Sequence, residues 1–378
     1  MPAAERLSGW GKTARKGLSH LGMPLIAVAI ALLVGALLML VIGISPVAAY
    51  GQLWAGTFAT KYQIGVTLVK ATPLMLTALG LGFAFRSGVF NIGAEGQIYI
   101  GALCGTFIGI QSLGLPAWIH IPLSLLAGFL GGGFWGAIPG FLKARYRVNE
   151  VITTILMNYI AILVVSYFTH GPLRADRTSE ASMPHTLEVQ LSSRLPIIWE
   201  GTRLHAGILL ALLAVVVMAF LTYRTAFGFK ARAVGFSPKA ARYAGMSVVP
   251  LVTLAMLISG GLAGMAGTVE ILGIQRRLRD QFLAGTGYTA IAIALFGRND
   301  PLGIALAAIL FGALEAGASN MEALAGVPST LVEILQAVII FLVAVSVSLP
   351  PGTLSGWARR LIPRRGESQP AGGGGHES

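Results

Sequence analysis

The sequence predicts an all-α integral membrane protein with about ten transmembrane helices. Of its 378 residues, 55% are hydrophobic and only 11% are charged, and the mean hydropathy is +0.75. A water-soluble globule of this length would need more polar side chains to cover its surface. Several apolar stretches, such as AGILLALLAVVVMAFLTY (206–223), approach or reach the ~20 residues that a helix needs to cross the hydrocarbon.

The helices are delimited by apolar runs between charged or Pro- and Gly-rich breaks. The expected spans are residues 23–44, 63–85, 92–111, 120–142, 150–170, 205–223, 249–273, 285–297, 302–318 and 330–349. The first span is longer than the ~7–15 apolar residues of a signal peptide, so we expect it to be retained. The eighth and ninth are separated only by GRNDP (297–301), and merging them would give nine helices.

The basic residues orient these helices. With the N-terminus in the cytoplasm, eighteen of the 27 Lys and Arg residues fall on the inner side, so both termini are expected there. The chain then divides into a cytoplasmic segment (1–22), a transmembrane domain (23–350) and a Gly-rich, disordered cytoplasmic tail (351–378). The excess of basic residues on the cytoplasmic side also explains the net charge of +12. Binding to nucleic acid does not, because the sequence contains no soluble basic module.

Small residues recur every four positions on three expected helices, which allows close helix packing in lipid. These ladders are Gly101, Gly105 and Gly109; Gly128, Gly132, Gly136 and Gly140; and Gly260 and Gly264. The GGGFWG within the second ladder matches a dinucleotide-binding pattern, but no strand precedes it. The GKT at 11–13 has Arg6 where a phosphate-binding loop needs glycine. We therefore expect no nucleotide site in this chain, and no metal site.

Polar side chains cluster where the third helix begins, in GVFNIGAEGQIYIGAL (88–103). Flexible glycines precede the helix, and Asn91 and Glu95 are four residues apart, so in a helix they project together. Asn91, Glu95 and Gln97 are therefore candidates for holding or gating the break in this helix.

The fifth helix carries a second polar group. Glu150, Thr154 and Asn158 recur every four residues and share one face, which predicts a polar stripe toward the interior. The alternative is a helix-start cap at Asn149 and Glu150 with a single interhelical hydrogen bond from Asn158.

Other charged residues lie within expected spans, where each costs ~2.5–3.5 kcal/mol at mid-bilayer and usually faces a cavity or a partner helix. Glu315, Glu333 and Gln336 either line a path through the bundle or lie at its outer interface. For Lys70 and Glu270 we expect side chains that extend to the outer surface.

The third and eighth helices are both short, are interrupted by glycine and enter from opposite sides. With ten helices, the second to fifth and the seventh to tenth form inverted repeats, a pattern typical of transporters.

The longest cytoplasmic loop, 224–248, contains a short capped helix. Ser237 is the expected N-cap, Pro238 occupies the first helical position and Gly245 ends the helix. A helix of ~2 turns is marginal alone, so it is expected to dock through Ala240, Ala241, Ala244 and Tyr243. A basic helix on anionic lipid is the alternative.

Three phrases, FRSGVFNIGAEGQ, NEVITTILMNYIA and FGFKARAVGFSPKAARYAGM, resemble the permease subunits of bacterial ABC importers. That family includes ribose, simple-sugar and branched-chain amino acid permeases, and the phrases are most similar to its nucleoside-importer branch. The resemblance covers residues 60–350 and implies a ten-helix permease. It also implies that the helix Ser237–Gly245, flanked by Gly228, Arg232 and Gly235, fits a groove on an ATPase subunit.

The resemblance implies a transport subunit in the bacterial cytoplasmic membrane with no enzymatic activity. The expected partners are an ABC ATPase that holds ATP and Mg, a second and non-identical permease, and an extracytoplasmic binding protein. Loop 171–204 is expected on the extracytoplasmic side. The resemblance places Asn91, Glu95 and Gln97 where the third helix breaks beside the translocation path. The polar stripe Glu150, Thr154 and Asn158 is a further candidate for the path or its gate, from its spacing alone. The alternatives are a simple-sugar permease and, from another class, an ion-coupled secondary transporter. A membrane-bound enzyme is disfavoured, because the sequence has no clustered His residues and no paired catalytic constellation.

Overall fold

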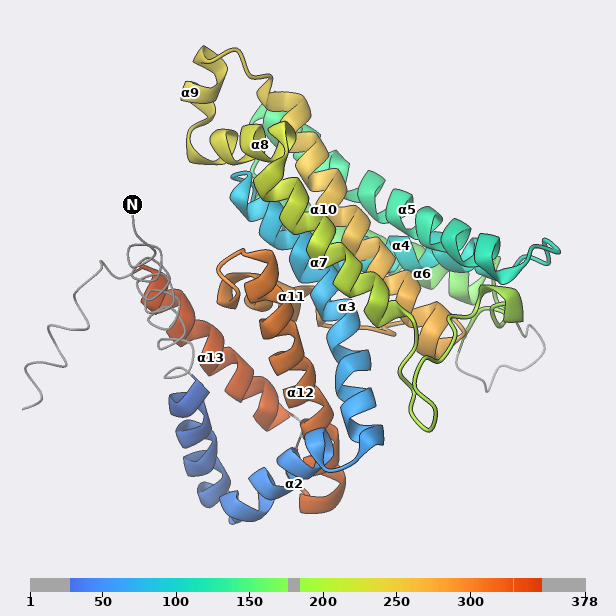
Figure 1. Ribbon diagram of the computed structural model, residues 1–378, viewed down its shortest axis with the longest axis vertical. Coiled ribbons are helices and arrows are strands. Elements are labelled where there is room, and N and C mark those ends of the chain that lie inside the picture. The colour runs from blue at the N-terminus through green and yellow to red at the C-terminus, as the bar shows by residue number, and fades with distance from the viewer. Residues whose placement is uncertain (1–27, 176–183, 329, 349–378) are drawn as a thin grey trace, which may run out of the picture.

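The computed structural model describes residues 28–175, 184–328 and 330–348, and in these ranges the chain is helical apart from loops and three isolated β-bridges (Figure 1). The predicted all-α class is confirmed for this part of the chain. A helix at Val28–Val41 comes first. It is followed by α2 (Pro46–Phe58), α3 (Lys61–Arg86), α4 (Ala94–Gly109), α5 (Ala117–Tyr146), α6 (Glu150–His170), η1 (Leu191–Ser193), α7 (Gly207–Arg224), α8 (Ala226–Phe236), α9 (Pro238–Tyr243), α10 (Val248–Glu270), η2 (Ile271–Gln275), α11 (Thr286–Phe296), α12 (Pro301–Ala325) and α13 (Thr330–Ser348).

Six of the described helices are long and apolar enough to cross a membrane: α3, α5, α6, α7, α10 with η2, and α12. Among these six, α3 is the most enclosed by the rest of the chain and α6 the least. Large apolar side chains on the outer helices remain exposed, including Phe134 of α5, Leu163 of α6 and Val216 of α7. A bilayer would cover such a surface, whereas water would not solvate it favourably.

The structure differs from the expected spans by two additional helices, α2 and α8. The third and eighth expected spans, 92–111 and 285–297, are present as the short helices α4 and α11, and turns or irregular chain precede them at 87–93 and 276–285. The segments 1–22 and 351–378, and the first residues of span 23–44, lie outside the described residues.

The two ends of the molecule are unlike each other (Figure 1). Helices α8 and α9 lie beyond the ends of α7 and α10, whereas α2 lies at the opposite end and packs on α12. The Nδ2 of Asn320 on α12 donates to the Gln52 carbonyl of α2 at 2.9 Å. Helix α3 connects these ends, from Lys61 beside α2 to Arg86 beside α8.

The predicted glycine ladders form the contact between α4, α5 and α10. A Cβ atom at Gly101 would overlap the backbone of Gly264, and one at Gly132 would overlap the Gly260 carbonyl. Backbones approach this closely only where side chains are absent, as in other helix pairs packed within lipid. The absence of side chains therefore brings the three helices into direct backbone contact.

This contact predicts that Gly101→Ala destabilises the chain. The added methyl has no space, and overpacking of this kind costs about 1–3 kcal/mol. Gly51→Ala is the matched control, since Gly51 also lies within a helix and no atom lies within 4 Å of an added Cβ. Thermal unfolding of the purified full-length chain in detergent measures both. A midpoint for Gly101→Ala at or above that of the control would contradict the packing argument.

Candidate functional site

The break before α4 is held by Asn91 and Gln97. Asn91 Nδ2 donates to Gln97 Oε1 and to Ser259 Oγ of α10, both at 2.9 Å. The Asn91 Oδ1 accepts from the Gly93 backbone N–H at 2.9 Å, which closes a turn of the type Asn side chains favour. Both side chains are buried. They fix the path of the chain into α4 and tie it to α10.

Glu95 joins the first turns of two helices. Its carboxylate lies in the first turn of α4 and accepts the backbone N–H of Gly285 at 2.8 Å and of Gly287 at 2.7 Å, where α11 begins. Helix N-termini have unpaired N–H groups and favour negative charge. One buried carboxylate thus satisfies the start of a helix that is almost two hundred residues away in sequence.

Asn158 connects α6 to both of these breaks. Its Oδ1 accepts from Gly96 N–H at 2.8 Å, and its Nδ2 donates to the Ile92 carbonyl at 2.9 Å and to the Tyr288 hydroxyl of α11 at 3.3 Å. With Asn91, Glu95 and Gln97, it forms what we term the buried polar network.

The predicted polar stripe on α6 is divided. Thr154 is buried but its hydroxyl donates to the Glu150 carbonyl of its own helix at 2.6 Å. Glu150 lies at the α9 end, where it forms an ion pair with Lys143, and Asn149 caps the helix by accepting from Val151 N–H. Of the three stripe residues, only Asn158 reaches the buried polar network.

The predicted short helix is present as α9. Ser237 Oγ accepts from Ala240 N–H at 3.2 Å, Pro238 occupies the first position, and Gly245 has a φ of +78° just after the helix. Helix α8 precedes it and is capped in the same way by Thr225, whose hydroxyl accepts from Gly228 N–H at 3.0 Å. The segment is therefore two helices joined at Ser237.

The faces of α9 differ from the prediction at Ala241. This side chain is buried against Val89, Val252 and neighbouring residues of the same chain, so it attaches α9 to the bundle. Ala240 and Ala244 are exposed, as expected for a docking face. Tyr243 and Phe236 are 95% and 92% exposed, and the two aromatic side chains are unusually free for their size.

The flanking glycines pack inside the chain. A Cβ at Gly228 would overlap the Leu221 carbonyl of α7, and one at Gly235 would overlap the Arg86 carbonyl of α3. These glycines hold α8 close to the ends of α3 and α7.

A charged and aromatic cluster ties α8 to α3 and α12. The Tyr223 ring lies 5.2 Å from the Arg86 guanidinium and 5.4 Å from that of Arg232 on α8. The Tyr223 hydroxyl donates to Asp300 Oδ1 at 2.6 Å, and Arg86 Nε donates to the Asn299 carbonyl at 2.6 Å. We call Arg86, Tyr223, Arg232 and Asp300 the junction cluster.

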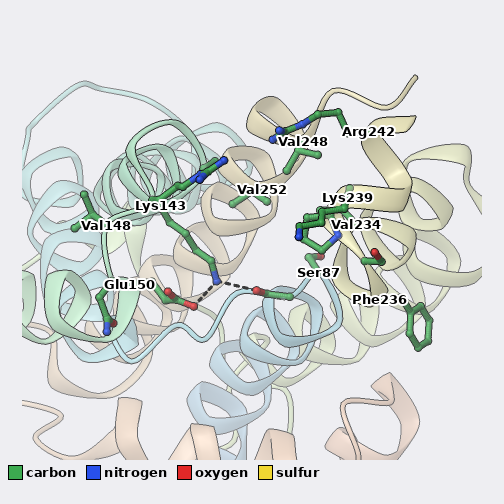
Figure 2. Close-up of a pocket in the computed structure, with 16 residues that line it drawn as sticks. Ser87, Lys143, Val148, Glu150, Val234, Phe236, Lys239, Arg242, Val248 and Val252 are labelled. Carbon is green, nitrogen blue, oxygen red and sulfur yellow. Dashed lines mark hydrogen bonds and ion pairs between the residues drawn. The ribbon is translucent and has the colours of Figure 1, made fainter. Parts of the chain in front are cut away.

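A cavity of about 740 Å³ lies beside α9, between α5, α6 and α8 (Figure 2). Lys143 spans it, bonding to Glu150 and donating to the Gly88 carbonyl at 2.8 Å. Lys239 and Arg242 add positive charge on the α9 side, while the Phe236 ring points away from the other lining residues (Figure 2).

A second cavity, of about 710 Å³, lies between α3, α11, α12 and α13. Lys70 is half-buried and lines this cavity with Glu315. The expectation for Glu270 was wrong, because its side chain is buried and accepts from Gln275 Nε2 at 3.2 Å instead of extending to the surface. Glu333 and Gln336 line the same cavity. No group of three or more His, Cys, Asp or Glu suited to a metal ion occurs in the described ranges.

A family model described as "Branched-chain amino acid transport system / permease component" matches residues 63–344. The chain belongs to this family. The guanosine ABC transporter permease protein NupP of Bacillus subtilis is 45% identical over 88% of this chain and 96% of its own length. The glucose ABC transporter permease protein TsgB13 of Haloferax volcanii is 38% identical over 85% of this chain and 87% of its own.

A further relative, the guanosine ABC transporter permease protein NupQ, also of Bacillus subtilis, is 30% identical over 66% of this chain and 79% of its own length. These relatives are transport subunits. With the six apolar helices, the family makes the chain a multi-pass membrane protein and a transport component.

The geometry of Glu95 predicts that Glu95→Ala destabilises the chain. Each hydrogen bond to a charged group contributes about 1.5–3 kcal/mol, and the variant leaves the buried Gly287 N–H and the half-buried Gly285 N–H unpaired. Glu322→Gln, an exposed change on α12, is the control. Thermal unfolding in detergent should show a clearly lower midpoint for Glu95→Ala alone; equal midpoints would show that the carboxylate is dispensable.

Proposed function

We propose that this chain is the permease subunit of an ATP-driven ABC importer of nucleosides. The observation that carries the proposal is the α8–α9 segment, which projects from the bundle with Phe236 and Tyr243 free and is anchored through Ala241 and the junction cluster. A separate ATPase would contact these two aromatic side chains. Amphipathic aromatic residues are favoured anchors at protein interfaces.

In this proposal α9 faces the cytoplasm, where the ATPase holds ATP and Mg, and the permease itself binds no cofactor. The chain crosses the bacterial cytoplasmic membrane ten times, with both termini inside and with α4 and α11 as the short helices of two inverted halves. Loop 224–248 then couples to the ATPase, and loop 171–204 faces the extracytoplasmic binding protein. Closure of the ATPase would shift α9 and open the bundle on the other side.

The second permease of the assembly is proposed to be a non-identical chain. Its support is that Bacillus subtilis has two guanosine permeases related to this chain, NupP and NupQ. The remaining polar residues, Asn91, Glu95, Gln97 and Asn158, hold the broken helices beside the path, while Thr154 packs next to them and Glu150 lies at the cytoplasmic cavity.

The nucleoside substrate rests on the similarity to NupP. A simple sugar is the second candidate, because TsgB13 is named a glucose permease and is also similar over most of this chain.

Uptake separates these substrates. Cells with and without the gene are given radiolabelled guanosine, uridine and glucose, and gene-dependent uptake of the nucleosides alone is expected. Gene-dependent uptake of glucose alone would replace the nucleoside proposal with the sugar alternative. Uptake that persists without the ATPase gene and stops when the proton gradient is collapsed would identify an ion-coupled secondary transporter instead.

The exposed aromatics predict how the ATPase is held. Tyr243→Ala combined with Phe236→Ala should lower the amount of ATPase that copurifies with the chain in mild detergent by about tenfold or more, as for other aromatic interface anchors. Trp118→Ala is the control. Trp118 is 76% exposed and lies at the start of α5, whereas it is the other end of α5 that lies beside α9. Retention of the ATPase by the double variant would refute docking through this segment.

The junction cluster predicts a loss of coupling rather than of assembly. Tyr223→Phe removes the hydroxyl that bonds Asp300 and keeps the ring between the two guanidinium groups. This hydrogen bond is exposed to solvent and contributes less than a buried one, but its loss loosens the cluster, so nucleoside uptake per ATP hydrolysed should fall while the ATPase still copurifies. Measuring uptake and hydrolysis in the same proteoliposomes tests this; an unchanged ratio would remove the cluster from the coupling path.

A further inference from the structure

We infer that the cavity between α3, α11, α12 and α13 is a binding site for the transported nucleoside, with Glu315 and Gln336 as its principal polar contacts. We term it the membrane cavity. This inference rests on the proposed function and adds to it the residues that would contact the substrate. At about 710 Å³, the cavity falls in the range of small-molecule sites.

The depth of the membrane cavity is consistent with a transport site. At about 1.5 Å per residue, Lys70 lies about 14 Å along α3 from Lys61, and Glu315 lies about 15 Å from Ala325 at the end of α12. Both helix ends lie at the face opposite α9. Lys70 and Glu315 thus line the cavity well inside the bundle, where ionisable residues usually mark a substrate or ion path.

Polar groups in the membrane cavity are available to a ligand. Gln336 is only 8% exposed, lines the cavity and has no hydrogen-bond partner within the described part of the chain. Lys70 interacts electrostatically with Glu315 and Glu270, yet it forms no ion pair within 4 Å among the described residues. Both side chains line the cavity and keep hydrogen-bonding capacity that no neighbouring residue of the described chain uses, so a ligand that supplies hydrogen bonds can be held here.

The chemistry of the lining fits a nucleoside better than a nucleotide. The Glu315 carboxylate accepts hydrogen bonds of the kind that ribose hydroxyls donate, and the Gln336 amide can both donate to and accept from the edge of a base. The Tyr288 ring lines the same cavity and offers a surface for the base. The lining contains two carboxylates, Glu315 and Glu333, and one ammonium group, Lys70, so its excess negative charge disfavours a phosphate group.

One wall of the membrane cavity is set by the buried polar network. Gly285, which lines it, is bonded to Glu95, and the Tyr288 hydroxyl accepts from Asn158. These two network residues are positioning residues for the site. Glu95 and Asn158 do not line the cavity themselves; they act by holding Gly285 and Tyr288, which do.

The test uses the complete importer, with its binding protein, ATPase and permease pair, in proteoliposomes. Because the binding protein captures the substrate first, the informative quantity is the uptake rate at saturating binding protein. For Gln336→Leu and Glu315→Gln, guanosine uptake should fall about tenfold, the loss expected when one hydrogen bond to the substrate is removed. For Gln336→Leu the ratio of guanosine to uridine uptake should also change. The subunit content of the complex should be unchanged, and Glu322→Gln on the same helix as Glu315 should behave as wild type.

Uptake and specificity that are unchanged in both variants, with an active wild-type importer, would overturn the site and leave the proposed function intact. A wild-type importer that takes up glucose and no nucleoside would overturn the proposed function itself. If the variants fail to assemble, photolabelling of the wild-type complex with 8-azidoguanosine decides the matter. Label on residues 281–289 or 315–337 supports the membrane cavity, and label confined to other segments overturns it.

Discussion

The buried backbone of two broken helices is the constraint on which the rest of the structure depends. Hydrocarbon offers no hydrogen bonds, so every N–H and C=O group inside the bundle needs a partner from the protein. The first N–H groups of α4 and α11 have no partner within their own helices. Side-chain oxygens of Glu95, Asn91 and Asn158 accept hydrogen bonds from backbone N–H groups at these two helix starts. The polar residues of this apolar chain are therefore placed where its helices are interrupted.

The glycine contacts among α4, α5 and α10 allow these polar groups to meet. Gly101 and Gly264 bring the backbones of α4 and α10 together, which places Ser259 within hydrogen-bond distance of Asn91. With larger residues, the two helices would separate and the buried polar network would lose its contact with α10. The close helix packing and the hydrogen bonds of the buried polar network therefore depend on each other.

Helix α12 begins at the junction cluster, through Asp300, and further along it forms a wall of the membrane cavity. Asp300 caps its start by accepting from the N–H groups of Leu302 and Gly303, and Glu315 lies about 22 Å further along the same helix. A movement of α8 relative to Tyr223 would therefore be transmitted to a single stiff element that reaches the proposed substrate site. Coupling over this distance needs no chain of small side-chain movements, because a helix moves as a unit.

The sequence alone determined the all-helical class, the short capped helix after Ser237 and the glycine ladders, because each depends on residues a few positions apart. It also marked Asn91, Glu95 and Asn158 as unusual. Only the tertiary structure decided their partners, since Gly285 and Tyr288 lie far from them along the chain. It likewise decided that Ala241 faces inward, that Lys70 and Glu315 share a cavity, and that helices α2 and α8 form. These features depend on which elements pack together, and a local pattern carries no information about contacts between distant segments.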